Sequence, residues 1–148
     1  MIPEFNAYGE LPEGTHDATL DEIEARYAIT AHRETLFECF SDWVDHMRSA
    51  GCHTFHLDGS YITNKDHPDD YDALWDTRGV DTSLIHPCLL AYPKDRDAIK
   101  DRFGGDIFPD HAIPEGSISF YLDRFQRETR EDVPRRKGII RVRFGDIG

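Results

Sequence analysis

Residues 57–74 read LDGSYITNKDHPDDYDAL, and our interpretation of the whole chain starts from this stretch. An apolar strand ends at Leu57, a turn of Gly59 and Ser60 follows, and a second strand opens at Asp70 after a polar loop. Residues two apart in a strand point to the same face, so we expect Asp70 and Asp72 to project together. Paired carboxylates suit a hard divalent cation such as Mg²⁺ or Mn²⁺, and a Gly-Ser turn offers N–H groups and a hydroxyl to a phosphate. The stretch therefore predicts phosphoryl or nucleotidyl transfer.

Length and composition predict one folded domain over residues 1–148. Hydrophobic residues make up 39% of the chain and aromatic residues 11%, which argues against wholesale disorder. The net charge is −12, with −14 on residues 1–110 and +2 on residues 111–148. This charge argues against generic DNA binding and against binding to an anionic membrane, although the last part of the chain can meet phosphates.

The three cysteines, Cys39, Cys52 and Cys88, have no spacing typical of a disulfide framework or a zinc module. The first residues lack the basic and apolar regions of a signal peptide, and no run of residues has the length of a membrane span. We therefore expect a cytoplasmic protein without a membrane segment.

Local patterns predict alternating helices and strands. A capping box of Thr19 and Glu22 opens a first helix, Thr30 caps a second one, and Gly51 ends it. The predicted elements, in chain order, are an extended arm over 1–16, helices over 19–27 and 30–50, strands over 53–57 and from 70, a helix over 94–103, a strand over 106–108, a helix from 117 and a strand over 137–144. This order predicts an α/β (α+β) fold with a mixed sheet flanked by helices.

The strand over 53–57 alternates in character. Phe55 and Leu57 are apolar, whereas Thr54 and His56 are polar, which predicts a strand buried on one face only.

A third carboxylate is needed to hold two metal ions, and Asp106 is our candidate because it opens a short apolar strand after a helix. Asp110 and Asp76 are the reserve candidates. In this position Asp106 also helps to deprotonate an attacking hydroxyl. The alternative is that these acids are surface residues, since the chain is acidic enough for the pair Asp95 and Asp97 to repeat the same spacing.

Basic residues are the second group of candidates. Lys65 lies in the loop between the Gly-Ser turn and the acids, together with Thr63, and is placed to neutralise a triphosphate. A basic segment near the end contains Arg124, Arg127, Arg130, Arg135, Arg136, Lys137, Arg141 and Arg143. Arginine is a good phosphate donor, but a run of charges is more often a solvated face, and we do not expect an RNA site here.

Gly59-Ser60 followed after nine residues by Asp70-x-Asp72 resembles the core motif of the polymerase-β-like nucleotidyltransferase superfamily. Within it, three stretches are similar to small bacterial domains of unknown function: Leu11 to Thr19 (LPEGTHDAT), Asp58 to Lys65 (DGSYITNK) and Lys137 to Ile140 (KGII). The likeness covers nearly the whole chain. Asp58 departs from the superfamily pattern, where a hydrophobic residue usually precedes the Gly-Ser pair.

The resemblance implies a nucleotidyltransferase-like domain that moves a nucleoside monophosphate from a nucleoside triphosphate to a hydroxyl of a protein or RNA. It implies that Asp70, Asp72 and Asp106 bind the metal and that Gly59, Ser60, Lys65 and Lys137 contact phosphates. It also implies a partner protein, as in toxin–antitoxin or phage-defence pairs. Two alternatives stay open: an inactive nucleotidyltransferase-fold module that acts as an antitoxin or binding partner, and a metal-dependent phosphohydrolase.

Overall fold

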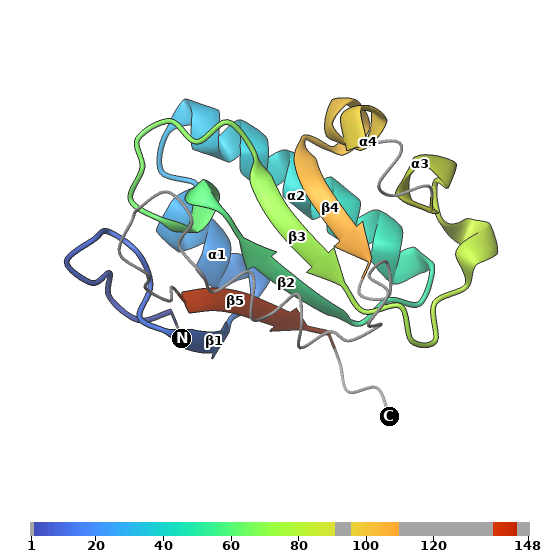
Figure 1. Ribbon diagram of the computed structural model, residues 1–148, viewed down its shortest axis with the longest axis horizontal. Helices are drawn as coiled ribbons and strands as arrows, with labels where there is room; N and C mark the ends of the chain where they lie inside the picture. Colours follow the sequence, from blue (N-terminus) through green and yellow to red (C-terminus); the bar gives the residue numbers. More distant parts are fainter. Residues whose placement is uncertain (1, 91–95, 110–137, 145–148) are drawn as a thin grey trace.

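A five-stranded mixed sheet lies at the centre of the computed structural model, which describes residues 2–90, 96–109 and 138–144 (Figure 1). Its strands are β1 (Gly14–Asp17), β2 (Thr54–Asp58), β3 (Tyr71–Trp75), β4 (Gly105–Pro109) and β5 (Gly138–Arg143), in the order β1-β5-β2-β3-β4. Strand β2 runs antiparallel to both of its neighbours, whereas β1 pairs with β5 and β4 pairs with β3 in parallel. The predicted mixed α/β architecture is thereby confirmed.

The helices form where the sequence predicts caps. Helix α1 (Leu20–Tyr27) begins at the Thr19–Glu22 capping box, in which both reciprocal hydrogen bonds are present at 3.1 and 3.0 Å. Helix α2 (Ala31–Ser49) is capped by Thr30, and Gly51 follows its end with φ +97°. The remaining helical segments are η1 (Ser60–Ile62), η2 (Thr82–Leu84), α3 (Pro87–Leu90) and α4 (Arg96–Phe103).

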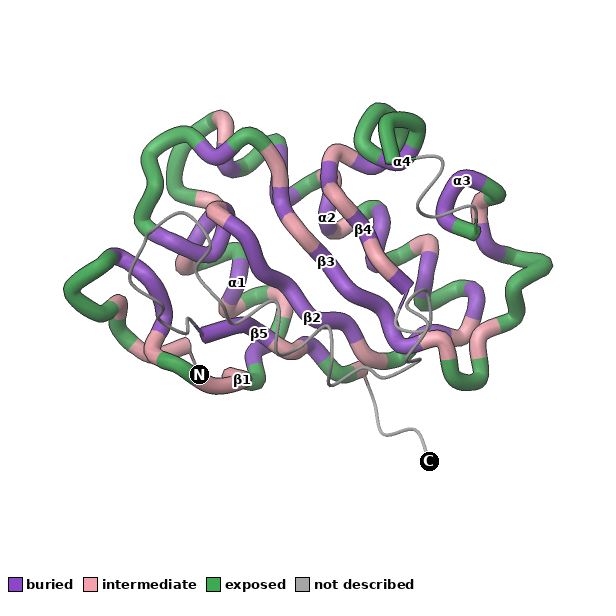
Figure 2. The backbone as a smooth tube through the Cα atoms, in the orientation of Figure 1, coloured by how far each residue is buried: buried purple, intermediate pink, exposed green. Residues whose placement is uncertain are grey.

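The core lies between the helices and one face of the sheet. The apolar side of α2 meets the strands through edge-on aromatic pairs, with ring centroids 5.2 Å apart for Trp43 and Phe55 and 5.3 Å apart for Phe40 and Tyr71. Figure 2 shows the buried residues running along the strands and along the inner side of α2. The core is therefore built by alternate strand residues, which leaves the other residues of each strand on the opposite face.

Strand β1 corrects the prediction of an extended arm over residues 1–16. Gly14 pairs with Gly138 of β5, and the Gly138 N–H donates to the Leu11 carbonyl at 3.0 Å. A side chain at position 138 would place its Cβ 2.1 Å from the Pro12 carbonyl oxygen, so this position requires glycine. Residues 11–14 and 138–140, from two of the stretches that carry the resemblance, are thus joined in space. The pairing connects strands 124 residues apart, so local sequence patterns do not reveal it.

His56 corrects the prediction of a strand buried on one face only. Its exposed fraction is 3%, and burial, followed by the nearby Arg141 charge, lowers the pKa of its imidazole to about 4. Leu74, which pairs with His56 across the sheet, is also fully buried. Strand β2 is therefore buried on both faces.

Several predictions fall on residues that the structure does not describe. They are the helix from Ser117, the reserve acid Asp110, the phosphate contact Lys137 and the basic residues from Arg124 to Arg136.

Candidate active site

Three aspartates lie in one row across the sheet. The register pairs Asp58 of β2 with Asp72 of β3, and Asp72 with Asp106 of β4. Paired residues of neighbouring strands project from the same face, so all three side chains lie on the face opposite the one that packs against α2. Asp70 lies one residue before the start of β3 and two residues before Asp72. The register therefore places Asp70, Asp72 and Asp106 at the same end of the sheet, where β2 ends and β3 and β4 begin (Figure 1).

The Gly59-Ser60 turn lies directly beside Asp72. Gly59 has φ +85°, and a Cβ at this position would lie 2.5 Å from Asp72 Oδ2. Both the conformation and the space exclude other residues here. Ser60 then begins the short helix η1, and the first N–H groups of a helix have no acceptor within it. A ligand of Asp72 would therefore lie close to the backbone N–H groups at the start of η1.

The acids on either side of Asp72 are ion-paired with helix α4. Lys100 Nζ lies 3.1 Å from Asp70 Oδ2, and the pair raises the pKa of Lys100 above its ordinary value. Arg96 donates from Nε and Nη2 to the two carboxylate oxygens of Asp106. Asp70 and Asp106 remain partly accessible, with side-chain exposed fractions of 25% and 19%.

The donor set fits a divalent cation in type and in register, because hard cations bind carboxylate oxygens and three carboxylates share one face. Within residues 2–90, 96–109 and 138–144, however, no three His, Cys, Asp or Glu side chains converge closely enough to hold an ion. The ion pairs to α4 account for this, since Asp70 and Asp106 are turned towards basic side chains. Metal binding would require both pairs to open.

Not all of the predicted phosphate contacts lie near the acids. Lys65 lines a small hollow with Arg26, Arg33 and Asn64, whereas Asp70 and Asp106 line a separate pocket. Thr63 supports the turn instead of facing a ligand, because its hydroxyl donates to the Ser60 carbonyl at 2.7 Å. Of the predicted phosphate contacts, the structure places Gly59 and Ser60 beside the acids and Lys65 farther along the loop.

Arg33 holds the loop between the turn and the acids, and our sequence interpretation missed it. It is 3% exposed, and its guanidinium donates to the carbonyls of Tyr61, Thr63 and Lys65 at 2.7, 2.9 and 2.6 Å. Burial lowers its pKa from the ordinary value, and the carbonyl oxygens supply the compensating contacts. A signal exists in the sequence: Arg33 lies in the first turn of a helix, where a positive charge opposes the helix dipole.

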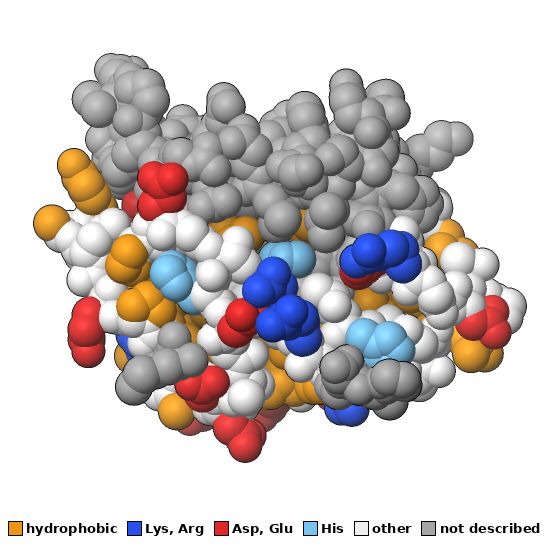
Figure 3. Space-filling model, turned by 90° about the horizontal axis from the view of Figure 1, so that it is seen from below, with side chains coloured by type: hydrophobic (Ala, Val, Ile, Leu, Met, Phe, Trp, Pro, Cys, Tyr) orange, Lys and Arg blue, Asp and Glu red, His pale blue; other side chains and the backbone are white. Residues whose placement is uncertain are grey.

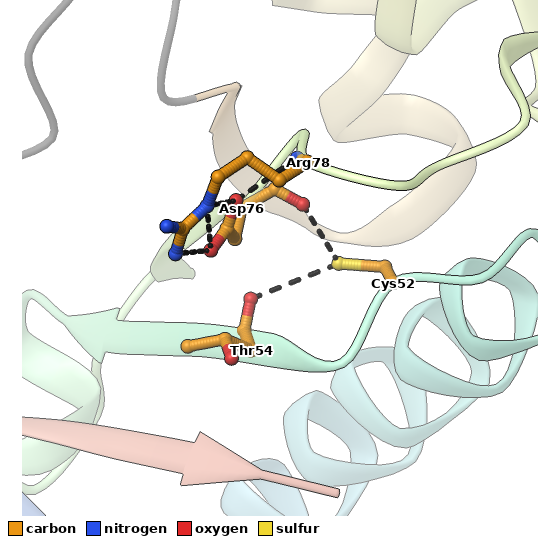
Figure 4. A network of polar contacts seen from close by, with 4 residues as sticks. All are labelled: Cys52, Thr54, Asp76 and Arg78. Atoms are coloured by element: carbon orange, nitrogen blue, oxygen red, sulfur yellow. Dashed lines mark hydrogen bonds and ion pairs between the residues drawn. The ribbon is translucent and has the colours of Figure 1, made fainter. Parts of the chain in front are cut away.

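Asp76, a reserve candidate for the third carboxylate, is instead part of a structural network (Figure 4). It is 6% exposed, and its carboxylate accepts from the Arg78 guanidinium and from the Arg78 N–H at 2.9 Å. The Cys52 thiol donates to the carbonyls of Asp76 and Thr54 at 3.3 and 3.7 Å. Asp76 follows the last residue of β3, so it lies at the opposite end of this strand from Asp70.

The described end of the basic segment is paired with an acid. Arg141 Nε lies 2.7 Å from Asp17 Oδ1, and Arg143 Nη2 lies 3.5 Å from Asp17 Oδ2. Figure 3 shows this side of the molecule, where basic side chains lie against acidic ones. These two arginines therefore form ion pairs with an acid at the surface of the β1–β5 pair, as expected of a run of charges on a solvated face.

Residues 3–143 match the model of a family of unknown function, DUF6932. The chain belongs to this family. No curated protein and no solved structure matches the DUF6932 chain. Across the described ranges, none of its helices is both long and apolar enough to cross a membrane.

Proposed function

We propose that this DUF6932 protein is a metal-dependent nucleotidyltransferase of the polymerase-β-like type. It moves a nucleoside monophosphate from a nucleoside triphosphate to a hydroxyl of a protein or RNA acceptor. The observation that carries the proposal is the register that aligns Asp72 with Asp106, with Asp70 two residues before Asp72 and the Gly59-Ser60 turn against the Asp72 carboxylate. Nucleotidyl transfer needs carboxylates for the metal and N–H donors for the phosphates at this short range.

In the reaction, the acceptor hydroxyl oxygen forms a bond to the α-phosphorus. The bond from this phosphorus to the oxygen bridging to the β-phosphate breaks, and pyrophosphate leaves with the electron pair. The hydroxyl proton passes to a carboxylate of the site, for which Asp106 is our candidate. Bound Mg²⁺ or Mn²⁺ supplies charge stabilisation at the phosphates and lowers the pKa of the hydroxyl. Asp70, Asp72 and Asp106 hold the cation, and Gly59 and Ser60 orient the triphosphate.

The test is transfer of label from α-³²P-labelled nucleoside triphosphates, with Mg²⁺ or Mn²⁺, into protein and RNA of a bacterial lysate. Asp72→Asn removes a ligand charge while keeping the side-chain shape, and Asp101→Asn on the exposed side of α4 is the matched control. We expect label with the wild type and the control and none with Asp72→Asn. Absence of label in all three, together with no metal-dependent nucleotide binding in calorimetry, would refute the proposal.

A second candidate function is a binding module that keeps this fold without catalysis and acts through a partner protein. The ion pairs of Asp70 with Lys100 and of Asp106 with Arg96 favour it, because they neutralise two of the three acids. In this case Asp72→Asn leaves partner binding intact. A pull-down with the Asp72→Asn protein beside the wild type separates the two functions.

A further inference from the structure

Helix α4 carries two basic side chains that pair with two acids of the candidate site. Lys100 contacts Asp70, and Arg96 binds Asp106 through both carboxylate oxygens. Together with Asp97, these four residues line an open pocket of about 340 Å³. The pocket thus carries charges of both signs, with Asp70 and Asp106 at the starts of the strands and Arg96, Asp97 and Lys100 on the helix.

The helix is anchored so that these two side chains always face the strands. Ile99 and Phe103, four residues apart, are buried at 0% and 3% exposure on the inner side of α4. The Tyr71 hydroxyl donates to the Phe103 carbonyl at 2.8 Å, which ties α4 to the start of β3. Residues four apart share a helix face, so Arg96 and Lys100 also project side by side. The backbone position of both cations is therefore set by buried contacts.

Their charged ends, in contrast, are not buried. The side chains of Arg96 and Lys100 are 54% and 53% exposed. Ion pairs with this exposure contribute little to stability, and their long side chains can turn to another partner at low cost. These pairs are therefore suited to exchange.

We propose that Arg96 and Lys100 are phosphate-binding residues that change partners when substrate binds. This inference rests on the proposed function. Without a divalent cation they neutralise Asp106 and Asp70. When a cation occupies these carboxylates, both side chains turn to the oxygens of the nucleoside triphosphate. Arg96 suits two neighbouring phosphate oxygens through its planar guanidinium, whereas Lys100 contributes a point charge.

The charges in the pocket support this exchange. Asp70, Asp97 and Asp106 carry three negative charges, and Arg96 and Lys100 supply two positive ones at the oxygens of Asp106 and Asp70. A divalent cation at the same oxygens is repelled by the guanidinium and the ammonium at such short range. A triphosphate brings about four further negative charges, which a divalent cation alone does not balance. Metal and triphosphate together therefore favour the exchanged state, and the metal alone does not.

Calorimetry on the full chain tests the exchange with two probes, Mn²⁺ alone and inorganic tripolyphosphate in excess Mg²⁺. The proteins are the wild type, the double variant Arg96→Gln/Lys100→Gln and the control Arg102→Gln. Arg102 is exposed on the same helix and is not among the residues that line the pocket. For the double variant we expect Mn²⁺ affinity to rise about fivefold, because the competing charges are gone. We expect its tripolyphosphate affinity to fall about thirtyfold, through the loss of two charge-assisted contacts. The control should match the wild type with both probes.

In the double variant the expected changes in Mn²⁺ affinity and in tripolyphosphate affinity have opposite signs, so other results overturn the inference. Unchanged tripolyphosphate binding by the double variant would reject the phosphate role and leave the proposed function standing. Weaker binding of both probes would mean that the two residues only maintain the shape of the site, and thermal unfolding shows whether this is a folding defect. If the wild type binds neither probe, the inference fails together with the proposed function.

Discussion

The two ends of strand β3 each hold an aspartate that is paired with an arginine or a lysine, but the pairs are built differently. At the far end, Asp76 is buried and bound by the side chain and the backbone N–H of Arg78, two residues later in the same turn. At the near end, Asp70 is partly accessible and paired with Lys100 from a separate helix, across an open pocket. The Asp76–Arg78 pair is formed within one turn and includes a backbone hydrogen bond, whereas the Asp70–Lys100 pair depends on side chains alone, which can be displaced.

This difference separates an acid that is fixed within its own turn from one that can exchange its partner. A carboxylate that accepts hydrogen bonds from its own turn cannot release its partner without disturbing the backbone. We therefore expect metal binding at such a carboxylate to be weak. An acid paired across a pocket releases its partner by a side-chain rotation alone. The position of the partner, in the same turn or on another element, is therefore more informative than the ion pair itself. The following four predictions test this comparison.

The largest effect is expected at Asp106, at the end of the sheet where we propose the active site. Asp106→Asn removes a ligand charge and a candidate proton acceptor, so we expect kcat/KM for nucleotidyl transfer to fall about a thousandfold, or roughly 4 kcal/mol. The melting temperature should change little, because the lost partner is the exposed Arg96. Steady-state kinetics and a thermal melt measure the two quantities. A large loss of stability with activity kept would place Asp106 in the same class as Asp76.

Arg33 supports the near end and is expected to have the next largest effect. Arg33→Met leaves the buried carbonyls of Tyr61 and Thr63 without their donor, which should lower the free energy of unfolding by roughly 3 to 4 kcal/mol. Arg48→Met, on the exposed side of the same helix, loses only a ring contact with Phe144 and should cost about 1 kcal/mol or less. Urea denaturation compares the two variants. An equal loss of unfolding free energy in both variants would show that the hydrogen bonds of Arg33 to the carbonyls do not stabilise the protein more than the ring contact of Arg48.

His56 lies between the two ends, on the same face as the acidic row. Its pKa is about 4 in the folded protein and about 6.5 when unfolded, so the unfolded state takes up the proton first as the pH falls. This contribution to stability is complete above pH 6.5 and is lost as the pH falls from 6.5 to 4, by about 2 to 3 kcal/mol. Denaturation at several pH values should show a weaker dependence in His56→Gln.

The control for this prediction is His53→Gln, at an exposed histidine just before the same strand. It should keep the wild-type pH dependence. If His53→Gln and His56→Gln behave alike, the buried imidazole is not the source of the acid sensitivity.

The smallest effect is expected at Asp76. Asp76→Asn loses the ion pair with Arg78 and keeps an oxygen for the Arg78 N–H, so the free energy of unfolding should fall by about 1 to 2 kcal/mol. Nucleotidyl transfer should be unchanged. The pKa of Asp76 is lowered because Arg78 outweighs the opposing effect of burial, so this contribution persists above about pH 4 and disappears below it. Loss of transfer in Asp76→Asn would contradict the division between the two ends.

Much of the fold follows from local patterns in the chain. Thr19 and Thr30 cap the first two helices as predicted, because a side-chain oxygen before a helix satisfies its first N–H groups whatever lies farther away. The alternation over Phe55 and Leu57 predicts β2, and a short apolar segment after a helix predicts β4. The grouping of Asp70, Asp72 and Asp106 was likewise expected, since Asp72 and Asp106 belong to strands identified from their own residues and Asp70 lies directly before the first of them.

Other features depend on contacts between distant parts of the chain. The β1–β5 pairing joins residues 124 positions apart, and a four-residue strand carries too little periodicity to be recognised alone. In the sequence Arg33 resembles a surface residue, and only the folded structure shows that it binds the carbonyls of the loop over 61–65. The partners of Asp70 and Asp106 on α4 become visible only when that helix packs beside β3 and β4.

The sequence by itself therefore determined helices α1, α2 and α4, most strands and the acids of the candidate site, because capping and periodicity are properties of neighbouring residues. Only the tertiary structure decided which acids share a row and which cations face them. Strand register and side-chain burial result from packing the whole chain at once, and no short segment contains that information.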